Sequence, residues 1–296
     1  ASAINGFFDP DNAHCVKILP FLGEYSWSVV IASLILTVCV AAVLIGGVKR
    51  IASVSQIVVP FMAILYFAFA VILIICNITE IPAAIKVIVT AAFTPKAVTG
   101  GAVGSMFVAM QKGVARGIFS NEAGLGSAPI AAAAAQTKEP VRQGLVSMTG
   151  TFIDTIVICT LTGLSIVLTG AWQVEGLEGV EVTTYAFQQG LPFPPAVSSF
   201  VLMLCLVFFA FTTILGWNYY GERCLEYLSG GNLKHVKVYR WIYIFAVFIG
   251  PYMTVSAVWT IADIFNGLMA LPNMIALFAL SGVVVRETKA FFKKQS

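Results

Sequence analysis

Charged side chains are scarce in this sequence. Only 17 basic and 14 acidic residues occur among 296, which is 10% of the chain, whereas a soluble domain has about 25%. The net charge of +3 is too small to indicate a nucleic-acid partner. Hydrophobic residues make up 59% of the chain, and the mean hydropathy is +0.92. We therefore expect an all-α integral membrane protein whose residues 1–296 form a single transmembrane domain in a lipid bilayer.

Residues that bind metals are also few. The two histidines, His14 and His235, are far apart, and no two of the six cysteines are close in sequence. Disulfide and zinc frameworks usually show cysteines or histidines at short fixed spacings. We therefore expect six free thiols, no metal site and no organic cofactor.

Long hydrophobic runs are what the sequence has in abundance. A helix that crosses a bilayer needs about 20 mostly apolar residues. Seven segments qualify, at residues 28–47, 57–76, 101–135, 144–170, 197–228, 238–258 and 261–285. As one straight helix the third would run about 50 Å, although a bilayer core is only about 30 Å thick. We therefore expect the third to consist of two half-helices around an interruption.

Two shorter apolar stretches, at 81–93 and 179–190, are predicted to be interfacial helices on the outer side of the membrane. The alternative for both is a solvated loop.

Lysine and arginine gather on one side of the seven segments. The basic side carries Lys49, Arg50, Lys138, Arg142, Arg223, Lys234, Lys237, Arg240, Arg286, Lys289, Lys293 and Lys294. The other side carries Lys17, Lys86 and Lys96. Because cytoplasmic loops are rich in Lys and Arg, we expect a multi-pass protein of the cytoplasmic (inner) membrane. Its N-terminus is predicted to lie outside and its C-terminus inside.

The third segment is interrupted by polar residues and glycines. Residues 117–129 read Gly-Ile-Phe-Ser-Asn-Glu-Ala-Gly-Leu-Gly-Ser-Ala-Pro. Non-helical backbone is tolerated at membrane depth only where protein buries it or where it lines a cavity. A glycine-interrupted apolar segment therefore indicates the binding site of a transporter. We expect Glu122 to shape this segment by accepting hydrogen bonds from the freed backbone N–H groups. The alternative is that Glu122 lies in an aqueous vestibule without a role.

Other charged residues also lie within apolar segments, where charge is costly. For Asp154 and Asp263 we favour structural contacts between helices over contact with a ligand. Lys112 and Arg116 share one face of a helix. Three roles remain open for this basic face: it attracts a carboxylate ligand, it extends to the membrane interface, or it pairs with Glu122. Asp154 and Asp263 lack a surrounding catalytic motif, so we do not expect an enzyme.

The fifth segment contains a second candidate site. Thr212 and Thr213 offer hydroxyl oxygens that suit a hard cation such as Na⁺, and Trp217 lies one turn beyond Thr213. The alternative is that the threonines bond to the carbonyls of their own helix and that Trp217 marks the membrane interface.

Several of these motifs closely resemble the sodium:alanine symporter family, whose members are alanine or glycine:cation symporters. The resemblance is carried by residues 113–129, 137–144, 152–155, 213–217, 220–227 and 266–273, and it extends from about residue 28 to the end. It implies Na⁺-coupled secondary active symport of a small neutral amino acid such as alanine or glycine.

The resemblance also implies a LeuT-type inverted-repeat fold. The seven segments would be helices four to ten, with residues 1–76 ending the first repeat and residues 97–285 forming the second. The amino-acid site would be lined by Phe119, Ser120, Asn121, Glu122, Ala123, Gly124, Thr213 and Trp217. Backbone N–H groups at the half-helix end would bind the carboxylate. Thr212 and Thr213 would bind Na⁺.

The first broken helix and the third helix of the family have no counterpart in this sequence. Residue 1 is alanine, and no signal peptide precedes the first segment. We therefore expect the chain to lack part of both sites and to be unable to transport by itself. The alternative is a truncated membrane fragment that does not transport.

Overall fold

A computed structural model of the chain describes residues 2–9, 11, 13, 15–17, 24–93, 101–122 and 124–295. These residues are almost wholly helical, as predicted. They divide into two compact units, Ala1–Ala84 with Leu161–Met253 and Ile85–Thr160 with Thr254–Ser296. The short strands β1 (Cys15–Lys17) and β2 (Glu24–Ser26) pair antiparallel in the first unit.

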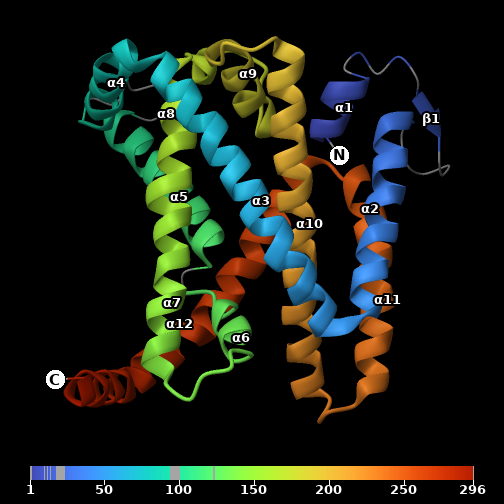
Figure 1. The fold of residues 1–296 in the computed structure, drawn as a ribbon, viewed down its shortest axis with the longest axis vertical. Helices are drawn as coiled ribbons and strands as arrows, with labels where there is room; N and C mark the ends of the chain where they lie inside the picture. The colour runs from blue at the N-terminus through green and yellow to red at the C-terminus, as the bar shows by residue number, and fades with distance from the viewer. Residues whose placement is uncertain are drawn as a thin grey trace. The chain divides into compact units, whose positions relative to one another are not determined.

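The first unit consists mainly of helices of very different length (Figure 1). They are α1 (Ser2–Phe8), α2 (Trp27–Ile45), α3 (Gly47–Cys76), most of α8 (Thr160–Leu168), α9 (Val180–Gly190), α10 (Pro195–Leu228) and α11 (Leu233–Ile249). Single 3-10 turns lie at Ile78–Glu80, Ala171–Gln173 and Gly250–Tyr252. Helix α10 packs against α3, α9 and α11, and α11 packs against α2.

Local sequence explains where α2 begins and ends. Ser26 precedes the helix, and its Oγ accepts a hydrogen bond from the backbone N–H of Ser28 at 3.2 Å. This contact satisfies one of the N–H groups that a helix start leaves without a partner. At the other end, Gly47 has φ of +71°, a conformation that residues with a Cβ rarely adopt. The chain therefore passes from α2 into α3 with only Gly46 between the two helices.

Two apolar clusters form the core of the first unit. One joins α2, α10 and α11 through Val40, Val43, Leu44, Leu215 and Ile244. The other joins α3, α9 and α10 and includes Ala70, Leu73, Phe187, Leu191 and Leu202. Many other large apolar side chains are exposed. This distribution is expected of helices whose outer faces contact lipid.

A buried ion pair links α10 to α11. The Glu222 carboxylate, whose side chain is 5% exposed, accepts two hydrogen bonds from Arg240, at 2.7 and 2.8 Å. It accepts a third from Asn218 Nδ2 at 2.8 Å. We expect Arg240→Met to lower the free energy of unfolding by about 2 kcal/mol, because it leaves a buried carboxylate without its cation. The loss is smaller than for a fully buried pair, because Arg240 is itself 22% exposed and water screens its charge.

Thermal melting of the detergent-solubilised protein measures this effect. The control is the double variant Glu222→Leu/Arg240→Met, which removes both charges and is expected to recover most of the loss. Unchanged melting of the single variant would show that the pair contributes nothing.

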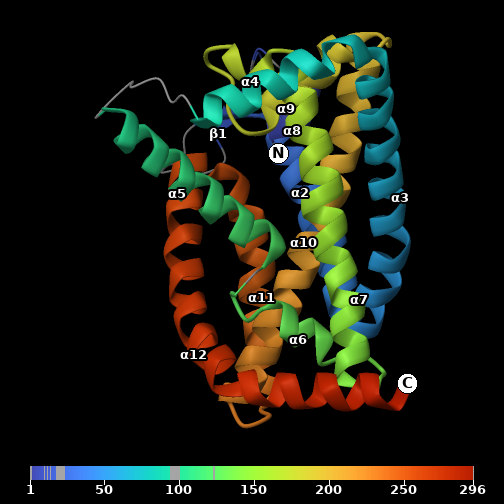
Figure 2. The ribbon, with the colours of Figure 1, turned by 90° about the vertical axis from the view of Figure 1, so that its left-hand side faces the viewer.

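The second unit contains the interrupted segment (Figure 2). Its helices are most of α4 (Ile81–Phe93), α5 (Gly101–Asn121), α6 (Ala128–Ala132), α7 (Pro140–Phe152), the π-helix η2 (Ile153–Cys159) and α12 (Val255–Gln295). Helix α5 contacts η2, and α7 contacts α12. The shorter stretches predicted at 81–93 and 179–190 are helices α4 and α9, so the alternative of plain loops is wrong for both.

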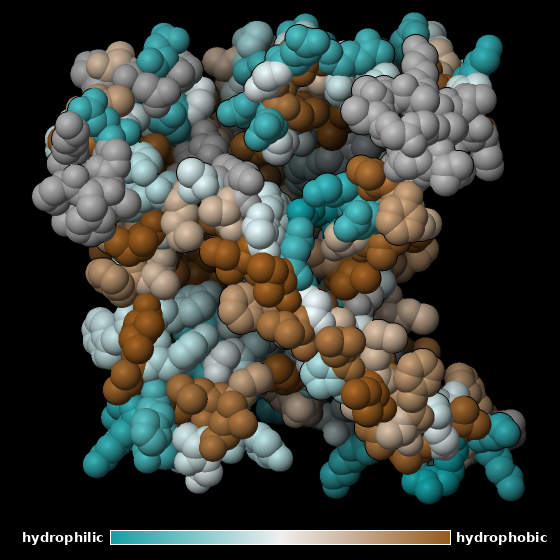
Figure 3. Space-filling view, turned by 180° about the vertical axis from the view of Figure 1, so that it is seen from behind, coloured by the Kyte–Doolittle hydropathy of each residue, from teal (hydrophilic) through white to brown (hydrophobic). Residues whose placement is uncertain are grey.

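Five helices of the described residues are long and apolar enough to cross a membrane. They are Trp27–Ile45, Gly47–Cys76, Pro140–Leu168, Pro195–Leu228 and Ala257–Lys294. They correspond to five of the seven predicted segments. The other two segments appear as α5 with α6 and as the 17-residue α11. That these two also cross the membrane remains a prediction. On the face that Figure 3 shows, many apolar side chains lie in the middle, and hydrophilic side chains gather at the top and along the lower edge.

Candidate functional site

The predicted interruption is present between α5 and α6. Helix α5 ends at Asn121 and α6 begins at Ala128. Three residues between them have positive φ: Glu122 at 51°, Gly124 at 77° and Gly126 at 80°. Two are glycines, which adopt this conformation without steric cost, whereas Glu122 is the only non-glycine residue with positive φ in the described chain. The second half-helix is shorter than predicted, because α6 has only five residues.

The Glu122 side chain spans this interruption. One carboxylate oxygen accepts a hydrogen bond from Ser127 Oγ at 2.7 Å, and Ser127 is 1% exposed. The prediction that Glu122 accepts from freed backbone N–H groups is therefore wrong for the described residues. The two left-handed glycines turn the chain back and bring the Ser127 hydroxyl within reach of the carboxylate. The backbone contributes separately, since Leu125 N–H donates to the carbonyl of Glu122 at 3.3 Å.

The last turn of α5 is tied to the π-helix η2 by two hydrogen bonds. Ser120 Oγ donates to Asp154 Oδ2 at 2.7 Å, and Thr155 Oγ1 donates to Asn121 Oδ1, also at 2.7 Å. Two consecutive residues of one helix thus meet two consecutive residues of the other. The wider turn of a π-helix changes the direction of successive side chains, and such turns are frequent at functional sites. Asp154 therefore has the contact between helices that we favoured from the sequence.

Helix α12 contacts α5 just before the interruption. The Arg116 guanidinium donates two hydrogen bonds to Asp263, at 3.2 Å each, and lies 3.8 Å from the ring centroid of Trp259. The same Trp259 ring meets Phe119 edge-on, with centroids 5.4 Å apart. Among the alternatives for Arg116, pairing with Glu122 is therefore wrong for the described residues. The cation pairs with Asp263 instead, which gives Asp263 a structural contact.

Helix α12 also contacts the second half of the interruption. Asn273 Nδ2 donates to the carbonyl of Gly124 at 2.9 Å. A Cβ added to Gly126 would lie 3.1 Å from the Asn273 side chain. One helix thus contacts the chain before the break and within it. Sequence reasoning assigned no role to Asn273 or Ser127. An amide directly after Pro272 in an apolar helix was the available signal for Asn273.

The residues predicted on α10 lie in the first unit. Thr212 Oγ1 donates to the carbonyls of Phe208 and Phe209, at 3.0 and 3.1 Å. The alternative of self-bonded threonines thus holds for Thr212. Thr213 is exposed, and its hydroxyl makes no hydrogen bond to any residue that the structure describes. Trp217 meets the ring of Tyr220 edge-on at 5.7 Å. Ala123, the remaining predicted site residue, lies outside the described residues.

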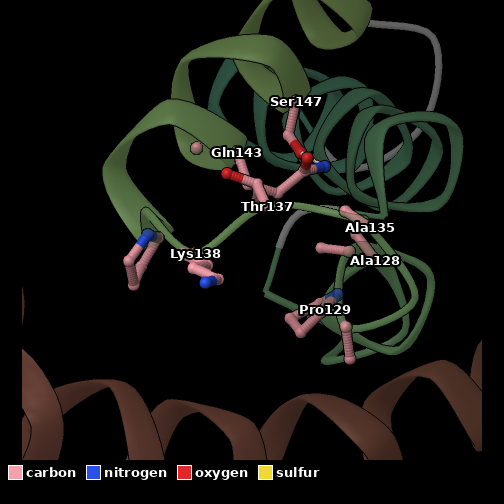
Figure 4. A pocket seen from close by; sticks show the side chains of 11 residues that line it. Ala128, Pro129, Ala135, Thr137, Lys138, Gln143 and Ser147 are labelled. Carbon is pink, nitrogen blue, oxygen red and sulfur yellow. Dashed lines mark hydrogen bonds between the residues drawn. The ribbon is translucent and has the colours of Figure 1, made fainter.

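A pocket of about 480 Å³ lies between α6 and the start of α7, within the second unit. Small side chains of α6 form one wall, and Thr137, Gln143 and Ser147 form a polar wall, as Figure 4 shows. Gln143 Nε2 donates to Ser147 Oγ at 3.3 Å. In the part of the chain that the structure covers, no three His, Cys, Asp or Glu residues are placed to hold a metal ion. The cysteines described there are free.

Comparison of the sequence with known proteins finds a matching family and several relatives. Residues 15–296 match the profile of the "Sodium:alanine symporter family". An uncharacterized transporter of Haemophilus influenzae is 55% identical over 267 residues, which are 90% of this chain and 58% of that protein. The sodium/alanine symporter AgcS of Methanococcus maripaludis is 47% identical over 264 residues, 88% of this chain and 56% of AgcS. The probable sodium/glutamine symporter GlnT of Bacillus subtilis is 37% identical over 277 residues, which are 94% of this chain and 56% of GlnT. The chain thus spans about half the length of these relatives.

Proposed function

Because the chain belongs to the sodium:alanine symporter family, we propose that it forms part of a carrier that couples Na⁺ entry to uptake of a small neutral amino acid. The family consists of symporters and not of enzymes. The observation that carries the proposal is the break between α5 and α6, with its three left-handed residues and its contacts to η2 and α12. A polar, non-helical segment in an apolar chain suits a small zwitterionic solute.

The fold of this carrier is proposed to be the LeuT-type inverted repeat. In this scheme α5 and α6 form the broken sixth helix, α10 is the eighth and α12 is the tenth. Residues 1–76 would end the first repeat, and residues 97–285 would form the second. The interrupted helix at the start of the second repeat supports this arrangement.

The solute is proposed to bind along residues 119–124, with Thr213 and Trp217 completing the pocket. Backbone N–H groups of the interruption would bind the carboxylate of the amino acid. The aromatic rings of Phe119 and Trp217 would limit the size of the side chain that fits. Alanine or glycine is the proposed solute, in keeping with the family.

Na⁺ is proposed to bind Thr212 and Thr213. The self-bonding of Thr212 is compatible with this role, because a hydroxyl that donates its hydrogen to a carbonyl keeps its oxygen lone pairs. The same bond fixes the direction of the oxygen. If Na⁺ raises the affinity for the amino acid, the amino acid must raise the affinity for Na⁺ by the same factor.

The carrier is proposed to reside in the cytoplasmic membrane, with the N-terminus of this chain outside and its C-terminus inside. The distribution of Lys and Arg among the loops supports this orientation.

The Thr213 hydroxyl and the Trp217 ring provide the test of the pocket. The complete carrier is this chain joined to the segment by which its relatives are longer. In it, we expect Thr213→Ala or Trp217→Ala to weaken alanine binding by about tenfold, or about 1.4 kcal/mol. Equilibrium binding of radiolabelled alanine measures this. Thr149→Ala is the control, because the Thr149 hydroxyl only bonds to a carbonyl of its own helix. Unchanged affinity in both variants would refute the assignment.

Transport by residues 1–296 alone is not expected. A LeuT-type site needs a broken helix from each repeat, and the chain spans about half the length of its relatives. Liposomes that contain only this chain should show no Na⁺-driven alanine uptake above protein-free liposomes. Robust uptake would show that these residues suffice.

A further inference from the structure

The last part of α12 differs from the rest of that helix. Figures 1 and 2 show α12 turning, so that its final stretch runs across the direction of its first stretch. The helix contains Pro272, which cannot donate the backbone hydrogen bond of a continuous helix, and Ser281 next to Gly282; both are features at which helices bend. Ser281 Oγ also donates to the carbonyl of Phe278 at 2.8 Å, a bond that favours bending.

The length of α12 exceeds what one crossing requires. The stretch Ala257–Lys294 of this helix has 38 residues, whereas a straight helix crosses a bilayer core with about 20. The remaining residues must therefore lie outside the core. The turn in α12 provides for this, because it directs the end of the helix sideways.

The residues of this end are sorted onto two faces. Arg286, Lys289, Lys293 and Lys294 are spaced i, i+3, i+7 and i+8, which places them on one face. Val284, Thr288, Phe291 and Phe292 are spaced i, i+4, i+7 and i+8 and form the opposite face. The only acid from Val284 to Gln295 is Glu287, which is paired with Arg286 at 3.4 Å. The face is therefore strongly basic.

Apolar side chains of this end remain accessible. Val284 is 59% exposed and Phe292 is 52% exposed, although the Phe292 ring meets that of Phe291 edge-on at 5.5 Å. In the lower right of Figure 3, where the end of α12 lies, apolar atoms adjoin hydrophilic atoms that point to the edge of the molecule. A short helix with a basic face and an exposed apolar face is typical of one that lies in a membrane interface.

We propose that residues 284–295 form an in-plane helix that binds the anionic lipid headgroups of the membrane leaflet. The phenylalanines insert below the headgroups, and the four cations contact the lipid phosphates. Anionic lipid is the occupant that fits, because clustered Lys and Arg next to a spanning helix are attracted to a negatively charged leaflet.

Hydrogen–deuterium exchange of the chain in nanodiscs tests this proposal. Nanodiscs of phosphatidylcholine alone are compared with nanodiscs that contain about 30% phosphatidylglycerol. We expect the amides of residues 284–295 to exchange about tenfold more slowly with phosphatidylglycerol, and the difference to shrink in 0.5 M salt because salt screens charge. In the variant R286Q/K289Q/K293Q/K294Q, the two lipid mixtures should give equal rates.

The matched control is K234Q/K237Q, which removes charges of the same sign from the start of α11. It should keep the full lipid dependence at residues 284–295. Exchange in α10 and α11 reports whether each variant is folded. Equal rates for the unaltered chain in both mixtures, or lipid dependence retained by the four-glutamine variant, would overturn the proposal.

Discussion

Gly126→Ala is expected to weaken alanine binding to the complete carrier by about 30- to 100-fold. Gly126 has φ of +80°, and a Cβ there would lie 3.1 Å from Asn273. A residue with a Cβ in this conformation costs about 1–2 kcal/mol. Displacing Asn273 would also remove its bond to the carbonyl of Gly124, worth about 1 kcal/mol. Both changes destabilise the loop conformation that binds the solute. The population of this conformation therefore decreases, and the apparent affinity for alanine decreases with it.

Gly117→Ala is the control for this prediction. Gly117 lies inside α5, nothing lies within 4 Å of an added Cβ, and alanine favours a helix. Its affinity for alanine should stay within about twofold of the unaltered carrier, a change that falls below about 0.5 kcal/mol. If Gly126→Ala and Gly117→Ala bind alanine equally well, the shape of the interruption does not determine binding.

Asp154→Ala is expected to weaken alanine binding by about 30-fold. The variant removes a charged acceptor from Ser120 Oγ, and such hydrogen bonds contribute about 1.5–3 kcal/mol. The last turn of α5 then keeps only one of its two hydrogen bonds to η2, the bond between Thr155 and Asn121. Because α5 ends directly before the break, its last turn sets the position of the proposed solute site.

A double-mutant cycle separates this contact from a general loss of folding. Ser120→Ala, Asp154→Ala and the double variant are compared by alanine binding and by thermal melting. We expect the two losses in affinity to be far from additive, because both variants remove the same bond. Additive losses would mean that Asp154 acts through something other than Ser120.

Much of the second unit could be predicted from the sequence, because several of its residues are unusual in a helix that crosses a membrane. The glycines and polar residues after Phe119 do not suit a continuous apolar helix, and the chain is indeed broken there. Asp154 and Asp263 were identified as helix contacts because a charge in an apolar segment needs a partner. Their partners, Ser120 and Arg116, were beyond sequence reasoning, because pairing depends on how helices cross.

Other features could not be predicted for related reasons. Glu122 bonds to Ser127 only because two left-handed glycines turn the loop, a geometry that composition does not encode. Asn273 reaches Gly124 across 149 positions, and only packing of α12 on the loop brings them together. The π-helix at η2 depends on which contacts its side chains make. Thr212 illustrates an alternative that sequence left open, since bonding to its own helix is possible in any helix.

The most direct test of the central claim is Na⁺-dependent alanine binding to the complete carrier, measured beside the Gly126→Ala and Gly117→Ala variants. If the break between α5 and α6 forms the solute site of a Na⁺-coupled carrier, alanine binds saturably and tightly in Na⁺. It then binds weakly when choline replaces Na⁺, and only Gly126→Ala loses affinity. Alanine binding that is equal with and without Na⁺, and equal in all three proteins, would contradict this account.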